Sequence, residues 1–148
     1  CSRCGTGPLW IAIYGQDAAS LITWGGVSDM CLTYLERSDL RRMLKRVIGG
    51  TPNRLPDEYK DRTPLYEVDK ILCDVLIIHG EKDVNVSVEH ANLLRSRLKD
   101  QGKEVDVWYF KDCTHYFPPK INRQIVRDLT KWMKEKALSG TIEVNGRS

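Results

Sequence analysis

The clearest feature of the sequence is an apolar run that stops at a glycine and gives way to charged residues. Residues 75–78 are all valine, leucine or isoleucine, and Gly80 separates them from the charged stretch that begins at Glu81. A short apolar run bounded by a turn residue is typical of a strand buried on both faces, as the central strands of parallel sheets are. We therefore predict a central parallel strand that ends at Gly80.

A second parallel strand is predicted further along the chain, with a helix between the two. Residues 105–110 are rich in β-branched and aromatic side chains, which favour strands. Ser87 is placed to cap the start of the intervening helix, and Gly102 is placed to end it. A strand, a helix and a strand in this order form a crossover unit with parallel strands. The apolar stripe of the helix consists of Ala91, Leu94 and Leu98.

On the N-terminal side the pattern predicts a helix, a strand and a second helix. Residues 9–14 are apolar and compatible with a helix, and Pro8 would lie inside that helix and remove a hydrogen bond. Residues 19–24 have the composition of another buried strand. Residues 31–48 are predicted to form a single amphipathic helix that ends at Gly49. Its apolar stripe consists of Leu40, Met43, Leu44 and Val47.

A loop, a closing helix and a tail complete the pattern. Residues 51–63 contain two prolines and several charges, and they are predicted to form a loop or short turns. After Pro118 and Pro119, apolar residues recur at helical spacing, which predicts a closing helix from Lys120 that packs against the sheet. Residues 139–148 have no such period and are predicted to be a tail. The apolar residues of the closing helix are Ile121, Ile125, Leu129, Trp132 and Met133.

The residues that follow the two predicted strands carry the candidate chemistry. Asp83 comes just after the first strand, and His115 lies in the loop after the second. Catalytic side chains collect at the carboxyl ends of parallel strands, and α/β hydrolases carry the acid before the histidine of their triad. Each residue alone has a plainer explanation, a turn-capping aspartate and a surface histidine. Their joint placement on successive strands favours the catalytic interpretation.

These residues carry a resemblance to a known family. From about residue 66 to residue 136, the sequence resembles the C-terminal part of the prolyl-oligopeptidase-like family of α/β-hydrolase serine peptidases and esterases. The resemblance implies an α/β fold of parallel strands alternating with helices in three layers, with residues 1–138 as the C-terminal part of the catalytic domain. The matching residues are Thr63-Pro64-Leu65, the run from Val75 to Asp83, Gly102, Thr114-His115-Tyr116-Phe117 and Trp132.

The resemblance places a nucleophile near the start of the chain. The segment from Cys1 to Gly5 is similar to the family's elbow Gly-x-Ser-x-Gly-Gly, with Ser2 as nucleophile and the backbone N–H of Arg3 as an oxyanion donor. An ungapped match over the interval to Asp29 would place Cys1 at that position instead. The segment could also be a plain loop. A Cys-x-x-Cys pair for zinc or redox chemistry is a further alternative, but no second pair with ligand spacing follows.

The resemblance implies a serine hydrolase that cleaves peptide or ester bonds without a cofactor or metal. Ser2 would attack the carbonyl, His115 would act as base and then as acid, and Asp83 would hold the other ring nitrogen. The remaining histidines are weaker candidates, since the family match makes His79 structural and His90 lies on a helix. Two alternatives stay open: a carboxylesterase of the same fold, and a noncatalytic fragment that acts as an assembly or binding module.

Composition narrows the partners and the compartment. The net charge of +3 is too small to indicate nucleic acid, and apolar residues interrupt the basic run 41–46, which predicts a solvated helix face. No leader and no apolar segment of membrane-spanning length is visible. The five cysteines are scattered and odd in number, so we expect a reducing, cytoplasmic environment rather than a disulfide framework, with Cys73 as a small core residue.

The resemblance also predicts an unpaired sheet edge. In the family, the strand that matches residues 19–24 pairs with the strand that leads into the elbow, and this sequence does not contain that partner. An unpaired strand offers its backbone N–H and C=O groups to any other strand. We therefore expect the chain to associate with the missing N-terminal half of the domain or with a second copy of itself.

Overall fold

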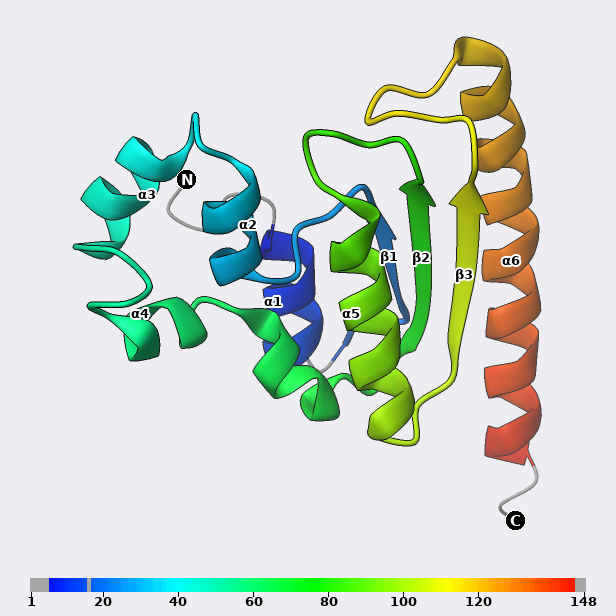
Figure 1. Cartoon of the computed structure of the whole chain (residues 1–148). Coiled ribbons are helices and arrows are strands. Elements are labelled where there is room, and N and C mark those ends of the chain that lie inside the picture. Colours follow the sequence, from blue (N-terminus) through cyan, green and yellow to red (C-terminus); the bar gives the residue numbers. More distant parts are fainter. Residues whose placement is uncertain (1–5, 16, 146–148) are drawn as a thin grey trace. The chain divides into compact units, whose positions relative to one another are not determined.

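The computed structural model describes residues 6–15 and 17–145 (Figure 1). The chain falls into two compact units, Cys1–His115 and Tyr116–Ser148. The first unit contains a parallel sheet of three strands in the order β1-β2-β3. The strands are β1 (Ser20–Trp24), β2 (Asp74–Gly80) and β3 (Val105–Phe110).

The strand β2 is central, as predicted from its unbroken apolar run. It is hydrogen-bonded to β1 on one side and to β3 on the other, and its residues from Val75 onward are buried. Val75 lies opposite Leu21 in β1 and Val105 in β3. Because all three strands run in the same direction, their carboxyl ends meet at one edge of the sheet (Figure 1). This edge carries the candidate site.

Three helices cover one face of the sheet in the first unit. They are α1 (Gly7–Tyr14), the 3₁₀-helix η1 (Pro64–Lys70) and α5 (Val88–Asp100). Their apolar side chains form one core with alternate residues of β1 and β2, including Leu21, Val75 and Ile77. The predicted stripe of α5 lies in this core, which confirms it, and Cys73 is half-buried against the same core.

Pro8 removes no hydrogen bond from α1, contrary to the prediction. The helix begins at Gly7, so Pro8 lies in its first turn. Backbone N–H groups in the first turn have no partner within the helix, and a proline there removes no hydrogen bond. Gly102 ends α5 as predicted, with a positive φ of 71°. Ser87 occupies the N-cap position of α5, but its hydroxyl makes no capping bond and donates to Glu36 instead.

The single helix predicted over residues 31–48 is wrong, because two helices form there. They are α2 (Met30–Glu36) and α3 (Arg41–Ile48). Arg37 leaves the helical conformation, and its guanidinium pairs with Asp39 two residues later. Ser and Asp also favour turns over helix interiors, since their side chains compete for backbone hydrogen bonds. The break therefore lies at residues 37–40.

The helix α3 ends at Gly49 as predicted, but its buried side differs from the predicted stripe. Leu44 and Ile48 are buried, whereas Met43 and Val47 are exposed. The basic residues of the helix are half-buried or exposed, in agreement with a solvated face.

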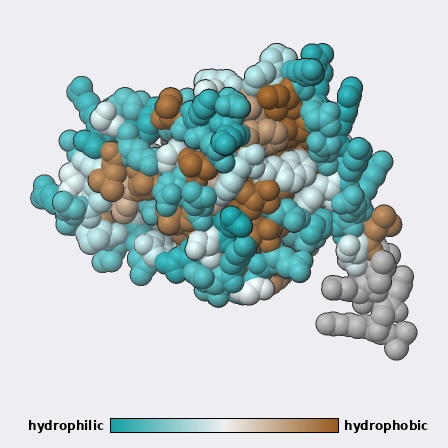
Figure 2. Space-filling view, turned by 45° about the vertical axis from the view of Figure 1, so that its right-hand side comes forward, coloured by the Kyte–Doolittle hydropathy of each residue, from teal (hydrophilic) through white to brown (hydrophobic). Residues whose placement is uncertain are grey.

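On the face shown in Figure 2, hydrophobic side chains lie in separate patches among hydrophilic ones.

The loop predicted over residues 51–63 contains a short helix, α4 (Pro56–Lys60). Tyr59 explains why this segment is ordered. Its ring is fully buried in a second, smaller core with Met30, Leu44 and Ile48, and its hydroxyl donates to the Gly50 carbonyl at 3.1 Å. Burial of a large aromatic side chain stabilises a helix too short to form by itself.

The second unit consists mainly of one long helix, α6 (Pro119–Asn145). It begins at Pro119, one residue earlier than predicted, because proline is tolerated in a first turn. Residues 139–145 of the predicted tail continue the helix after the good helix formers Lys136, Ala137 and Leu138. Within the described residues, no helix is both long and apolar enough to cross a membrane.

Candidate active site

Asp83 and His115 meet at the carboxyl edge of the sheet. Asp83 lies in the turn after β2, and His115 lies in the loop after β3. The distance from His115 Nδ1 to Asp83 Oδ2 is 2.8 Å. A carboxylate oxygen can only accept, so Nδ1 carries the proton and donates it. The contact predicted from the sequence is therefore present, while the catalytic role of the pair stays a prediction.

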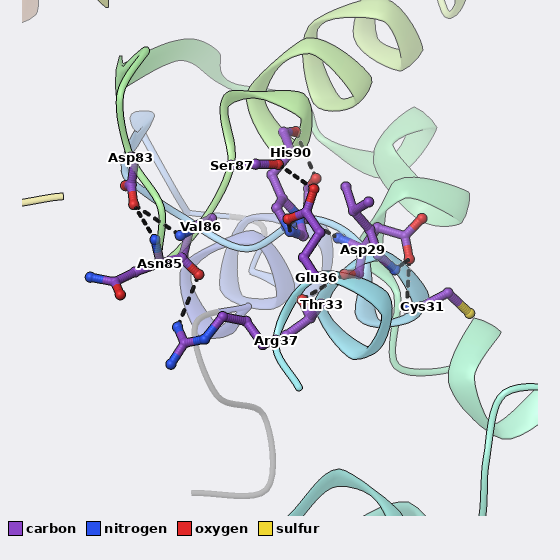
Figure 3. A network of polar contacts seen from close by, with 12 residues as sticks. Asp29, Cys31, Thr33, Glu36, Arg37, Asp83, Asn85, Val86, Ser87 and His90 are labelled. Carbon is purple, nitrogen blue, oxygen red and sulfur yellow. Dashed lines mark hydrogen bonds and ion pairs between the residues drawn. The ribbon is translucent and has the colours of Figure 1, made fainter. Parts of the chain in front are cut away.

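The carboxylate of Asp83 is held on both of its oxygens. Its other oxygen, Oδ1, accepts the backbone N–H groups of Asn85 and Val86, each at 2.9 Å (Figure 3). The side chain is only 1% exposed, against 32% for His115. Burying a carboxylate is costly unless hydrogen bonds replace its water. These contacts replace that water, and they also fix the direction in which Oδ2 faces the imidazole.

Gly25 lies against the pair. It follows β1, has a positive φ of 60°, and donates its N–H to the Ile78 carbonyl at 3.0 Å. A Cβ at this position would lie 3.4 Å from His115 Nδ1 and 3.6 Å from Asp83 Oδ2. These are ordinary van der Waals distances, so it is the backbone conformation that favours glycine here. The sequence signal was the Gly25-Gly26 pair after a predicted strand. Only the structure shows that Gly25 lies against His115 and Asp83.

Gly80 allows two segments to approach closely: the loop after β3 that carries His115, and the turn of residues 81–86 that carries Asp83, which we call the acid turn. A Cβ on Gly80 would lie 2.6 Å from the Thr114 carbonyl oxygen and closer still to that of Cys113. The Lys82 N–H also donates to the Cys113 carbonyl, at 3.0 Å. Because no side chain separates the two segments, the loop after β3 can place His115 beside Asp83.

His79 supports the acid turn from the side of the sheet. Its ring is 1% exposed, and its Nε2 lies 2.7 Å from the Val86 carbonyl oxygen. A carbonyl accepts, so Nε2 carries the proton of this imidazole. The same nitrogen lies 3.7 Å from Asp83 Oδ2. These contacts are those of a structural residue.

His90 has a structural role that its sequence context did not reveal. It is buried on α5, and its Nδ1 accepts the N–H groups of Ser28 and Asp29 at 3.2 and 3.4 Å. The Ser28 hydroxyl donates to the His90 carbonyl at 2.7 Å. Burial lowers the pKa of His90, so the neutral form that can accept through Nδ1 is favoured. The residue fastens the turn after β1 to α5.

An apolar pocket of about 450 Å³ opens beside His115. The cation on its wall, Arg37, is paired with Asp39 through two contacts of 2.8 and 2.6 Å. A third N–H of this guanidinium donates to the Asn85 carbonyl at 3.0 Å. The charge of Arg37 is thus already compensated within the protein. Apolar residues on the pocket wall are Trp24, Val27, Met30, Met43, Leu44 and Val86.

The predicted nucleophile lies outside the described residues. This holds for Ser2, for the oxyanion donor Arg3, and for Cys1 as the alternative nucleophile. The zinc or redox hypothesis for the segment from Cys1 to Cys4 falls outside them as well. Among residues 6–15 and 17–145, no group of three or more histidine, cysteine or acidic side chains could hold a metal ion.

The cysteines of the described region do not offer another nucleophile. Cys31, Cys73 and Cys113 are all free thiols. Burial raises the pKa of each of these thiols. Among them, Cys113 is buried in the loop before His115. A raised pKa keeps the thiol protonated, and the protonated thiol is the unreactive form.

Sequence similarity now shows the family. The model of the prolyl oligopeptidase family matches residues 19–140, and the chain therefore belongs to this family of peptidases, as the resemblance predicted. A Bacillus subtilis (strain 168) protein named uncharacterized peptidase YtmA is 62% identical over 122 residues, which are 82% of this chain and 48% of that protein. Dipeptidyl-peptidase 4 of Giardia intestinalis is 30% identical over 108 residues, 68% of this chain and 14% of that protein.

Solved structures agree with the fold. Pyrococcus horikoshii acylaminoacyl peptidase matches with a TM-score of 0.69 and 25% identity, over 75% of this chain and 18% of that one. Porphyromonas gingivalis dipeptidyl peptidase 4 matches with a TM-score of 0.72 and 18% identity. This match covers 88% of this chain and 18% of that one. The predicted class, the C-terminal part of an α/β-hydrolase fold, is confirmed. The chain spans about half the length of YtmA and a smaller part of the others.

Proposed function

We propose that this chain supplies the acid and the base of a serine hydrolase that cleaves peptide bonds. The observation that carries the proposal is the 2.8 Å contact between His115 Nδ1 and Asp83 Oδ2 at the carboxyl edge of the sheet. An imidazole oriented by a buried carboxylate has the arrangement that a general base needs. Membership of the prolyl oligopeptidase family makes serine chemistry the first choice for this pair.

In this proposal Ser2 is the nucleophile. As its hydroxyl oxygen attacks the carbonyl carbon, His115 Nε2 takes the hydroxyl proton, and Asp83 stabilises the resulting imidazolium. The backbone N–H of Arg3 donates to the oxyanion. His115 then gives the proton to the departing amine as the peptide bond breaks. A water molecule, deprotonated by the same ring nitrogen, releases the acyl group from Ser2.

The pocket beside His115 favours an uncharged, apolar group on the substrate. Its wall is mainly apolar, and Asp39 compensates the charge of Arg37, so an acidic substrate side chain would gain little there and would lose its hydration. The relatives that carry names are called peptidases, which favours peptide over ester substrates. Ester cleavage by the same residues is the second chemistry.

The free thiols Cys31, Cys73 and Cys113 favour a reducing compartment, and we propose that this compartment is the cytoplasm.

A second candidate function is that of a noncatalytic assembly module. It is favoured by the outer edge of β1, which has no strand partner among the described residues. In this case Asp83 and His115 would only stabilise the loops that follow β2 and β3.

Covalent labelling separates these functions. A fluorophosphonate probe, which reacts with activated serines, should label the protein that contains this chain at Ser2. Ser2→Ala should abolish the label, and His115→Gln should reduce it strongly because the base is lost. Labelling that depends on Cys1 would show that the ungapped match is right. A folded protein that takes no label at any residue would overturn the catalytic proposal and favour the assembly module.

A further inference from the structure

Two adjacent residues at the end of α2 grip the turn that carries Asp83. Arg37 Nη1 donates to the Asn85 carbonyl at 3.0 Å, and the Ser87 hydroxyl donates to Glu36 Oε1 at 2.6 Å (Figure 3). We call Glu36 and Arg37 the α2 clasp. Its two contacts lie on either side of Val86, whose N–H is bonded to the Asp83 carboxylate.

The guanidinium of Arg37 is itself held in place. Asp39 accepts from Nε at 2.8 Å and from Nη2 at 2.6 Å, a two-point contact that fixes the plane of the group. This hydrogen bonding raises the pKa of Arg37. With two nitrogens occupied by Asp39, the third is directed at the Asn85 carbonyl. Arg37 therefore presents a fixed donor to the acid turn, rather than a free charge to the pocket.

The acid turn is thus fixed from two sides. On the side of the sheet, His79 Nε2 donates to the Val86 carbonyl at 2.7 Å. On the other side, the α2 clasp holds the two neighbouring residues. If the clasp opened, Asn85 and Val86 could move, and their N–H groups would leave Asp83 Oδ1. The carboxylate would then be free to turn away from His115.

We propose that the α2 clasp positions the carboxylate of Asp83, with Arg37 as the main positioning residue. The proposal rests on the function proposed for Asp83 and His115. It adds that residues more than forty positions upstream set the orientation of Asp83. In active sites generally, hydrogen bonds from surrounding residues hold a catalytic side chain in its productive orientation. Because Arg37, Asn85 and Val86 also line the pocket, the clasp joins the pocket wall to the acid.

Amide hydrogen exchange on the full chain tests the proposal without requiring activity. In Arg37→Met, the amides of Asn85 and Val86 should exchange about tenfold faster, as expected when a charge-assisted hydrogen bond to a loop is lost. The matched control is Arg41→Met, whose guanidinium also donates to two backbone carbonyls, those of Tyr34 and Leu35, both at 2.8 Å. In this control the two amides should exchange as in the parent chain.

Two outcomes would overturn the proposal. One is unchanged exchange of the Asn85 and Val86 amides in Arg37→Met. The other is an equal acceleration at Leu94 and Leu98 in the core of α5, which would show general destabilisation. If Arg37→Met does not fold, Ser87→Ala opens the other half of the clasp and should accelerate the Val86 amide alone, and no acceleration there would equally overturn it.

A proton resonance distinguishes positioning from a merely structural role. The His115 Nδ1–H that donates to Asp83 should give a low-field proton signal, which Arg37→Met should shift and broaden while Arg41→Met leaves it in place. An unchanged signal in Arg37→Met would show that the clasp does not position the acid. If the signal responds as expected but Ser2 takes no covalent label, the positioning stands and the catalytic proposal fails.

Discussion

At the scale of single residues, the site depends on glycine as much as on its polar groups. Gly25 has a positive φ of 60° and lies against the ring of His115. We expect Gly25→Ala to destabilise the fold by about 1–2 kcal/mol, because alanine is strained in this backbone conformation. Urea denaturation of the variant and the parent chain measures the difference.

The neighbouring glycine provides the control. Among the described residues, a Cβ on Gly26 would meet only the Cβ of Thr23, at 3.6 Å, which is an ordinary contact. Gly26→Ala should therefore change the free energy of unfolding by less than Gly25→Ala does. If the two variants lose the same stability, the backbone conformation at Gly25 is not what the site requires.

The two polar residues of the site could be predicted from the sequence, but their supports could not. Asp83 and His115 follow strands with clear apolar patterns, and parallel strands bring their carboxyl ends together whatever the rest of the chain does. His90, Arg37 and Asp39 give no such signal. His90 contacts Ser28 across 62 positions, and nothing in the local pattern of either segment indicates that contact.

At the scale of elements, prediction succeeded where one periodicity held over a whole segment. The strands β2 and β3 and the helix α5 have such patterns, and they form with the predicted bounds to within a residue or two. The break between α2 and α3 was missed, because it follows from the local pairing of Arg37 with Asp39, which the spacing of apolar residues does not show. The short helix α4 was missed because it depends on the burial of Tyr59, a tertiary effect.

His90 links two of these elements in a pH-dependent way. It joins α5 to the turn between β1 and α2 through the N–H groups of Ser28 and Asp29. Burial lowers its pKa from the ordinary value of 6.5, against the opposing effect of the nearby carboxylates of Glu36 and Asp29. The folded state therefore favours the neutral imidazole more than the unfolded chain does.

The sign of the pH effect follows from this shift. Below pH 6.5 the unfolded chain binds a proton at His90 that the folded chain does not yet bind. The free energy of unfolding should therefore fall as the pH falls from 6.5 toward the lowered pKa, by at most about 1.4 kcal/mol per pH unit from this residue. Above pH 6.5 the effect should vanish.

The variant His90→Gln isolates that contribution, since its amide oxygen can accept a hydrogen bond but does not titrate. Denaturation curves at several pH values between 5 and 8 should show a smaller slope in His90→Gln than in the parent chain. His79 and His115 are present in both proteins, so their contributions cancel in the comparison. Equal slopes in the two proteins would show that His90 does not control the acid sensitivity of the fold.

At the scale of the whole molecule, the outer edge of β1 is the feature that bears on association. This strand is bonded to β2 on one side, and none of the described residues forms a strand on the other side. A groove of about 270 Å³ runs along this edge, lined by Pro8, Ile11, Ala12, Ala18 and residues of β1. Ile11 in this groove is 70% exposed. An open strand edge beside apolar side chains favours association with another strand.

We therefore expect the isolated chain to self-associate through β1, burying about 1,000 Å² or more in a stable contact, unless a longer protein supplies the neighbouring strand. Light scattering coupled to size-exclusion chromatography at micromolar concentration should give a dimer or a larger species. Ile11→Lys should shift it toward monomer, because a charge on the groove opposes a second copy. Leu35→Lys is the matched control, since Leu35 is 65% exposed on α2 and does not line the groove. A well-folded parent chain that is monomeric without any partner fragment would show that the edge is protected and that the assembly function has no support.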